Sequence, residues 1–489
     1  MKNIIRITGL TLILLIACKK DFITILPTSN VTIDVLYVTD KDFQDGITGA
    51  YRTLQQLSVN FWQFGDLRGD DTQAGITSNT PAYAFDIDQF YINNDASILS
   101  DTWRDYYKLI NRVNTVLSKI ENTDPSIVIN KARHIAEAKF LRAFAYFNMV
   151  RIFGDVPMIT SPVTVQESYN ISRESVANIY NQIIIPDLIA AANGLSLKYT
   201  GNDVGRATIG AAKALLGNVY LTVHDFISAE AKLQEVTTMG YALLPNFNDL
   251  FDYTKNEHHT EYIFDIEFEQ GINLGNPLTN QFAVSTQGGG AGVPAEEARL
   301  YGITGGGGGD SGCPIQGLFD AFDPLDKRKD ITVAKGFTGA NGVFIPLSTK
   351  GVPSFCKKYM CPTIINSDSK ANWKVIRYAD VLLMYAEALN ENGKTAQALT
   401  NLNLVRTRAG LAGYTGLTQS DARDKILTER RFELYLEGHR WFDLLRTGRA
   451  LSASSKYGMK DYMSVFPIPL SQLLLVNNPS IFAQNPGYE

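Results

Sequence analysis

The fold of this chain is decided near its end, by residues 428–448, T-E-R-R-F-E-L-Y-L-E-G-H-R-W-F-D-L-L-R-T-G. We call these residues the charged stretch. It carries four acids and four arginines, so its formal charge is zero, and large apolar residues stand between them. A solvated run of charges would hold few such residues. The pattern therefore predicts an amphipathic helix packed on the body of the protein, with partly buried and paired charges, because an unpaired buried charge is costly.

A ladder of opposite charges follows from the spacing within this stretch. Four residues alternate in sign at intervals of three: Glu437, Arg440, Asp443 and Arg446. If one helix continues past Gly438, these side chains are neighbours on one face. We expect the ladder and Trp441 to lock the C-terminal helices to a helical pair at 374–409, and not to form an active site.

Length and composition are those of a globular protein. The chain has 489 residues, of which 45 % are hydrophobic and 19 % charged, and its net charge is −5. Nucleic-acid binding needs a concentrated basic surface, which a net negative charge does not favour. We expect no nucleic-acid partner and no cofactor.

The N-terminus has the pattern of an export signal. Lys2 and Arg6 precede an apolar run at residues 7–17, which ends in Leu15-Ile16-Ala17-Cys18. A basic start and a short apolar segment are typical of a signal peptide, and the cysteine at its end makes residues 1–17 similar to a bacterial lipoprotein signal. Lipidation at Cys18 would anchor residues 18–489 to a membrane. The alternative is an ordinary signal peptide whose cleavage site adjoins a cysteine.

The rest of the chain reads as mainly α, in one domain. We expect an extended leader (18–40), an N-terminal helical part (41–240), a loop-rich, glycine-containing insertion (241–370) and a C-terminal helical part (371–489). Apolar residues at three-to-four spacing predict helices at 40–57, 101–121, 131–153 and 173–193. Pro186 should kink or split the last of these.

Two segments suggest an internal helical repeat. Residues 207–239 contain Leu215-Leu216 and, fourteen positions on, Ala229-x-Ala231. Residues 374–409 contain Leu382-Leu383 and, again fourteen positions on, Ala396-x-Ala398. Two helices joined by a short turn, with small residues where they cross, are typical of tetratricopeptide-like repeats.

Two other regions read as irregular. Residues 58–100 show no sustained period, which predicts a long structured loop, and such loops are often functional. In the insertion, residues 261–269 alternate acids and apolar residues, which predicts a short strand with one polar face. Glycine then gathers at 288–290 and 305–309. A phosphate-binding loop is not indicated, because no strand precedes the glycines and no Lys-Ser or Lys-Thr follows them.

Several motifs together resemble one family. They are Cys18 followed by Asp21-Phe22 and Pro27; Trp103-x3-Tyr107-x2-Ile110-x3-Asn114; Glu137-Ala138-Lys139-Phe140-Leu141-Arg142-Ala143 with Arg151-Ile152-Phe153-Gly154-Asp155-Val156-Pro157; Ile376-Arg377-Tyr378-Ala379-Asp380-Val381-Leu382-Leu383 with Ala386-Glu387-Ala388; and the charged stretch. In this order they are similar to the SusD/RagB family of outer-membrane lipoproteins, over nearly the whole mature chain.

The resemblance implies a helical scaffold of tetratricopeptide-like pairs with a loop-rich second face and a few short strands. It implies a lipid-anchored, surface-facing protein of the outer membrane that is not an enzyme. Such a protein would capture oligosaccharide, or peptide in the RagB-like branch, and pass it to a SusC-like TonB-dependent transporter.

Candidate ligand contacts must be argued from chemistry, because the family motifs are mainly structural. An oligosaccharide site needs exposed rings for the apolar sugar faces and polar side chains for the hydroxyls. Residues 58–95 and the glycine-rich insertion supply both types: Trp62, Asp66, Arg68, Asp70, Asp71, Tyr83, Phe85, Tyr91 and Tyr301.

The sequence gives weaker support for other kinds of functional site. Adjacent Asp70 and Asp71 do not specify the separation that a glycosidase needs between its carboxyl groups. Residues 257–261, E-H-H-T-E, lack the H-E-x-x-H spacing, so we expect no metal site. Cys356 and Cys361 are close enough in sequence for a disulfide, and the sequence leaves this open. A secreted hydrolase and a purely structural scaffold remain as alternatives.

Overall fold

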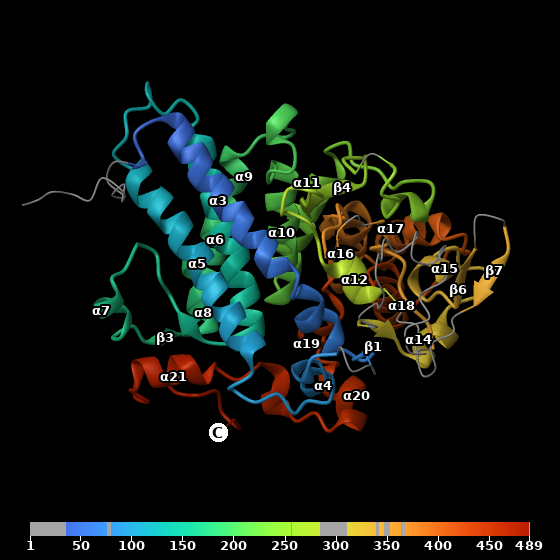
Figure 1. Cartoon of the computed structure of the whole chain (residues 1–489). Helices are drawn as coiled ribbons and strands as arrows, with labels where there is room; N and C mark the ends of the chain where they lie inside the picture. Colours follow the sequence, from blue (N-terminus) through green and yellow to red (C-terminus); the bar gives the residue numbers. More distant parts are fainter. Residues whose placement is uncertain are drawn as a thin grey trace, which may run out of the picture.

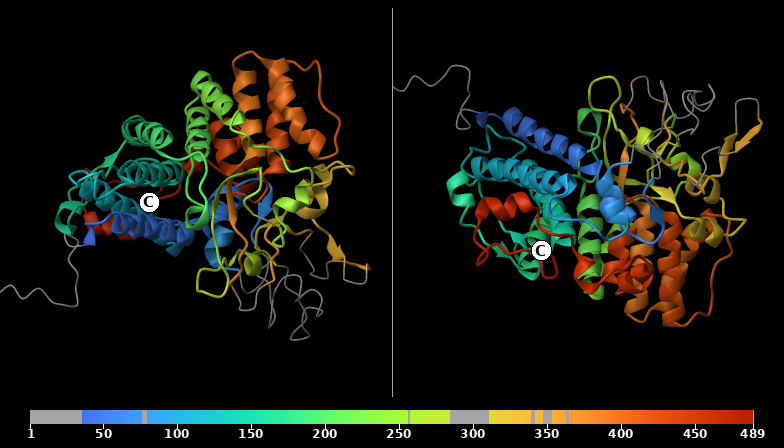
Figure 2. Two further views of the ribbon diagram at one scale, coloured as in Figure 1. Left: turned by 90° about the horizontal axis from the view of Figure 1, so that it is seen from above. Right: turned by 60° about the horizontal axis from the view of Figure 1, so that its bottom comes forward.

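The computed structural model describes residues 36–75, 80–255, 257–283, 311–338, 342–346, 353–362, 365 and 367–488. Cys18, the glycine runs and Tyr301 therefore lie outside the described residues. The protein is mainly helical, as predicted. Its long helices follow one another across the molecule. Most of the short strands and irregular segments gather at one end of this row, and the strand at 173–174 lies beside the first helices (Figures 1 and 2).

The first part of the row is built from three long helices. They are α3 (Asp40–Ser58), α5 (Ser97–Ile120) and α6 (Lys131–Phe153), and each packs against the next. α6 has the predicted bounds and ends at Gly154, whose φ of 71° suits glycine. The N-cap of α3 is Thr39 in a capping box with Asp42. Asp40, the first residue of α3, accepts a hydrogen bond from the backbone N–H of Asn130 at 2.8 Å.

The helix expected at 173–193 is split, as Pro186 predicts. α8 (Val176–Ile179) runs through a π-helical turn (Tyr180–Ile184) into α9 (Ile185–Gly194). Pro186 lies in the first turn of α9, where a backbone N–H has no intrahelical acceptor to lose. α9 packs on both α6 and α10, and so it connects the first helices to the repeat pairs.

Both predicted helical pairs are present and stand side by side (Figure 2). They are α10 (Ile209–Thr222) with α11 (Phe226–Thr237), and α16 (Tyr378–Glu391) with α17 (Thr395–Arg408). α11 packs against α16.

The predicted register of the repeat was wrong by two residues. Counted from the helix starts, Ala229 corresponds to Ala398, and both are buried, while Ala231 and Ala396 are exposed. Leu215-Leu216 therefore does not correspond to Leu382-Leu383. Ala229 and Ala398 are therefore the alanines that face the core in the two pairs.

The charged stretch is not one helix. α18 (Gln419–Glu433) ends before a turn in which Leu436 and Gly438 have φ values of 60° and 84°, and α19 (Arg440–Arg446) follows. The turn breaks the predicted ladder, so of its neighbouring members only Asp443 and Arg446 pair, at 2.7 Å. The chain then runs through α20 (Ala450–Ser454) to α21 (Leu470–Val476) near the C-terminus (Figure 1).

The described strands form two-stranded antiparallel sheets. β4 (Tyr262–Ile266) pairs with β8 (Trp373–Arg377), β1 (Thr72–Gln73) with β5 (Cys313–Pro314), β2 (Val156–Pro157) with β3 (Arg173–Glu174), and β6 (Gly336–Thr338) with β7 (Phe344–Pro346). The expected polar face of β4 is not exposed. Asp265 is 2 % exposed and is paired with Lys374 of β8 at 2.5 Å.

The segment expected to be a long loop, 58–100, is largely helical and buried. It contains a π-helical turn, η2 (Gln63–Leu67), and α4 (Ala82–Asp88). Short helices also occur at α7 (Val165–Ser168), α12 (Leu278–Phe282), α14 (Gln316–Ala321) and α15 (Lys329–Thr332). Cys356 and Cys361 are buried free thiols, so they form no disulfide. In the part of the chain that the structure describes, no helix has the length and apolarity to cross a membrane.

Candidate ligand-binding surface

Glu433, at the end of α18, is the centre of a buried cluster of charges. Arg328 donates to its Oε2 at 2.9 Å, and Arg377 and Arg408 donate to its Oε1. The exposed fractions of these four side chains are at most 3 %. Burial would raise the pKa of Glu433, but the three guanidinium groups hold it well below its ordinary value. A carboxylate held this way stays ionised and cannot serve as a proton donor at neutral pH.

The other charges of the stretch tie it to the second helical pair. Glu437 accepts from Lys358 at 2.6 Å and from Arg377 at 2.7 Å. Two further pairs reach α16: Arg430 with Asp380 at 2.7 Å, and Arg446 with Glu387. The predicted contact with 374–409 is therefore confirmed for Glu437 and Arg446, and it is wrong for Arg440 and Trp441.

Arg440 and Trp441 point to a different region. Arg440 donates through Nε and Nη2 to the two oxygens of Asp70, at 2.7 and 2.8 Å. Trp441 is fully buried, with its ring 5.7 Å from that of Phe90. Both side chains thus hold the 58–92 segment, and not the helical pair, against the stretch.

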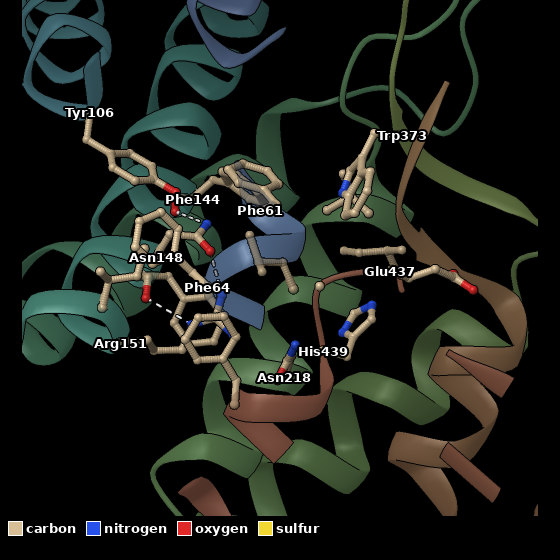
Figure 3. A pocket seen from close by; sticks show the side chains of 17 residues that line it. Phe61, Phe64, Tyr106, Phe144, Asn148, Arg151, Asn218, Trp373, Glu437 and His439 are labelled. Carbon is tan, nitrogen blue, oxygen red and sulfur yellow. Dashed lines mark hydrogen bonds between the residues drawn. The ribbon is translucent and has the colours of Figure 1, made fainter. Parts of the chain in front are cut away.

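A small cavity lies beneath the turn of the stretch (Figure 3). Phe61, Phe144, Trp373 and His439 are among its lining residues. Its volume is about 50 Å³, which is room for a few water molecules at about 10–15 Å³ each. Small-molecule sites measure about 300–1,000 Å³, so this cavity cannot hold a sugar ring.

Four of the predicted ligand contacts lie inside the protein. Trp62, Asp66, Arg68 and Asp71 have exposed fractions of 0–2 %. The Trp62 ring meets Phe282 edge-on at 5.3 Å, and the Arg68 guanidinium lies 4.0 Å from the Phe90 ring centre. Side chains enclosed in this way cannot stack on a sugar from solution. We therefore assign these four to the fold, which corrects the expectation that they contact ligand.

Asp70 and Asp71 are used in ion pairs. Asp71 accepts hydrogen bonds from Nε and Nη2 of Arg431, and Asp70 accepts a hydrogen bond from Nε of Arg440. Burial would raise the pKa of Asp70, but the hydrogen bonds and charge of Arg440 lower it. An acid pair for hydrolysis needs one carboxyl group that stays protonated, which this environment opposes. Asp70 therefore also belongs to the fold.

Asp66 is buried without a cation directly on it. Its Oδ2 accepts from the backbone N–H of Gly438 at 2.6 Å, and burial raises its pKa to about 8. This contact is possible because η2 lies very close to the turn: a Cβ on Gly65 would stand 2.2 Å from the carbonyl oxygen of Gly438. No spacing rule in the sequence reveals this approach.

The remaining predicted contacts lie at or near the surface. Tyr91 is 72 % exposed and Phe85 is 38 % exposed, while Tyr83 is half-buried against the core. Tyr301 falls outside the described residues. We call Tyr83, Phe85 and Tyr91 the α4 surface.

The α4 surface lies beside the base of the glycine-rich insertion. Asp88 of α4 accepts from the backbone N–H of Ala74 at 3.0 Å, just after β1. β1, which lies beside α4 in Figure 1, pairs with Cys313 and Pro314 of β5. The α4 surface is therefore joined through β1 to residues 313–314 of the insertion.

The histidine-rich turn at 257–261 shows no metal geometry. His258 pairs with Glu267 at 3.1 Å, and His259 Nδ1 accepts from the backbone N–H of Glu261 at 3.2 Å. Burial and the nearby Lys374 lower the pKa of His259 to about 4. Among the described residues, no group of three or more potential metal ligands is assembled.

Two larger grooves lie on either side of residues 204–206, where sequence reasoning had indicated nothing. One, of about 480 Å³, runs between α3 and β4; the other, of about 600 Å³, is lined by Tyr199, Tyr241 and Tyr262. Because these rings come from separate segments, no local spacing could have shown that they gather.

Comparison with known proteins identifies relatives over the whole described body. A family model described as "SusD family" matches residues 355–488, and one described as "Starch-binding associating with outer membrane" matches residues 36–221. SusD-like protein P2 of Formosa agariphila is 27 % identical and covers 92 % of this chain and 93 % of its own length. The starch-binding protein SusD of Bacteroides thetaiotaomicron is 23 % identical and covers 76 % of this chain and 75 % of its own.

Solved structures agree with these matches. A laminarin-binding SusD-like protein superposes with a TM-score of 0.77 at 29 % identity, over 92 % of this chain and all of that protein. Surface glycan-binding protein A of Bacteroides fluxus superposes with a TM-score of 0.76 at 23 % identity and supports the fold alone.

Proposed function

Because the chain belongs to the SusD/RagB family, we propose that it is a cell-surface lipoprotein that captures oligosaccharide and delivers it to a SusC-like TonB-dependent transporter. Relatives named for starch and laminarin support the ligand class. The description "associating with outer membrane" supports the location.

The exposed rings of the α4 surface carry this proposal. Tyr91 is 72 % exposed, and an exposed aromatic ring can cover the apolar face that a sugar offers. Phe85, 38 % exposed, lies on the same short segment, so a chain of sugars could meet both rings at once. The site binds ligand and leaves it intact.

The binding claim is tested by isothermal titration of the full chain with oligosaccharides from starch, laminarin and xylan, and with a peptide mixture. We expect one oligosaccharide class to bind and to be recovered uncleaved. Tyr91→Ala should weaken binding about tenfold, the loss of one stacking contact of about 1–1.5 kcal/mol. Ile227→Ala removes an equally exposed apolar side chain (77 %) from α11 and should change nothing. Binding of peptides alone, or cleavage of the sugar, would contradict the proposal.

The anchor and the transporter are separate parts of the proposal. Leu15-Ile16-Ala17-Cys18 supports lipidation at Cys18, so Cys18→Ala should release the protein from the outer-membrane fraction. A tagged chain should co-purify with a TonB-dependent transporter from its own cells. Retention of Cys18→Ala in the membrane, or recovery without any transporter, would refute the respective part.

A further inference from the structure

The two grooves beside residues 204–206 are adjacent parts of one hollow surface. Val204, Gly205 and Arg206 line both of them. We call the 480 Å³ part the α3 groove and the 600 Å³ part the tyrosine groove. Each falls within the size range of small-molecule sites, about 300–1,000 Å³. No lining residue of either comes from 58–92, so the hollow is separate from the α4 surface.

The segment between the grooves is held rigidly. Asp203 accepts from Arg133 at 2.9 and 3.0 Å and from Arg206 at 2.8 Å, and Arg206 also donates to Glu137 at 3.0 Å. Glu137 has no exposed surface. A site whose walls are fixed before binding loses less entropy when a ligand enters.

A glycine and a hydrogen-bonded pair form the waist between the grooves. Gly205 has a φ of 93°, and a Cβ there would stand 2.6 Å from the side chain of Glu267. Glu267 lines the α3 groove and His258 lines the tyrosine groove, and the two are joined at 3.1 Å. The waist is therefore polar and narrow, while the space on either side is wider.

The tyrosine groove is lined by aromatic rings and by threonine side chains. The Tyr262 ring meets His258 edge-on at 5.0 Å, and Tyr199 lies over the guanidinium of Arg133 at 5.4 Å. Thr200 and Thr260, both exposed, add hydroxyl groups. Since Arg133 and Arg206 are neutralised by Asp203 and Glu137, the walls suit an uncharged ligand with apolar faces and many hydroxyl groups.

We propose that the tyrosine groove and the α3 groove form a second saccharide-binding site, in which the tyrosine groove stacks one sugar and the waist hydrogen-bonds to the next. The proposal rests on the proposed function for its ligand class, but not on the α4 surface. Its occupant is a short neutral oligosaccharide that touches residues 197–206 and 257–263.

Hydrogen–deuterium exchange of the full-length lipoprotein in detergent tests the site directly. The probes are laminari-, malto- and xylo-oligosaccharides at millimolar concentration. We expect slower exchange at 197–206 and 257–263 with at least one probe. Thr260→Arg, which places a bulky side chain in the groove from an exposed position, should abolish that protection and weaken the second binding event at least about tenfold. Thr400→Arg, the same change on the exposed face of α17, should leave both unchanged.

Each outcome separates the two proposals. Protection confined to 82–92 overturns the second site and leaves the proposed function intact. Protection at the groove without 82–92 supports the second site and removes the α4 surface as a ligand contact. Protection at the groove that persists in Thr260→Arg overturns the second site, and protection at neither place with every probe overturns both proposals.

Discussion

Replacing Trp441 with alanine should destabilise the protein without changing what it binds. The indole has no exposed surface and packs against the Phe90 ring and the Arg68 guanidinium, each 5.7 Å from it. Truncation of a buried Trp costs about 3–5 kcal/mol, because it removes the transfer free energy of the ring and leaves a cavity. With an unfolding entropy of about 2.1 cal/mol/K per residue, a chain this long should lose about 3–5 °C in Tm.

Differential scanning calorimetry measures this shift, and Trp441→Phe is the matched control. Among the described residues the Trp441 Nε1–H has no hydrogen-bond partner, so phenylalanine loses no hydrogen bond and keeps the ring contact with Phe90. We expect it to cost about 1–2 kcal/mol. Oligosaccharide affinity of the folded variants should stay within about twofold of the parent, less than 0.5 kcal/mol. An unchanged Tm in Trp441→Ala, or lost binding in a protein that is still folded, would refute this reasoning.

Three further predictions follow from the same region. Gly65→Ala should cost about 2 kcal/mol or more in unfolding free energy, because its Cβ would overlap the backbone of Gly438. Burial raises the pKa of Asp66, so the parent should lose unfolding free energy as pH rises from about 5 to 8. Asp66→Asn lacks this ionisation, and its unfolding free energy relative to the parent should rise by up to about 1.4 kcal/mol per pH unit. Asp70→Ala and Arg440→Ala should each destabilise, and a double-mutant cycle should show coupling of about 0.5–3 kcal/mol.

Urea unfolding measures all three, and each has its own check. Gly49→Ala, in the middle of α3, meets only Arg112 at 3.9 Å and should stabilise by about 0.5–1 kcal/mol; a loss as large as that of Gly65→Ala would show that the close approach is not the cause. Parallel pH profiles for the parent and Asp66→Asn would show that Asp66 ionises normally. Additive effects in the cycle would mean that Asp70 and Arg440 do not interact.

The long helices could be predicted because their signals are local. In α6, apolar residues recur over the whole helix, and Gly154 and Pro157 follow directly, so both ends were found. Pro186 likewise marked the break before α9. The register of the repeat pairs was missed because Leu-Leu pairs are common in buried helices, and the sequence does not show that Ala229 and Ala398 are buried while Ala231 and Ala396 are exposed.

The structure of residues 58–92 could not be predicted from the sequence, because the residues that bury this segment are far away along the chain. Asp71 pairs with Arg431, which is 360 positions further on. Before such partners are known, a run of Asp, Arg and Gly looks like a solvated loop. For the same reason the sequence suggested that Asp66, Arg68 and Asp70 could contact a ligand. Of the other predicted contacts, Phe85 and Tyr91 are exposed.

The charged stretch also holds together residues that are far apart in the sequence. The Tyr435 hydroxyl accepts from Thr72 at 3.3 Å and donates to the Gly312 carbonyl at 3.0 Å. Arg431 holds Asp71 beside Thr72. Because these contacts join β1 and Gly312 to the stretch, substitutions of Asp71 and Thr72 should act on stability first.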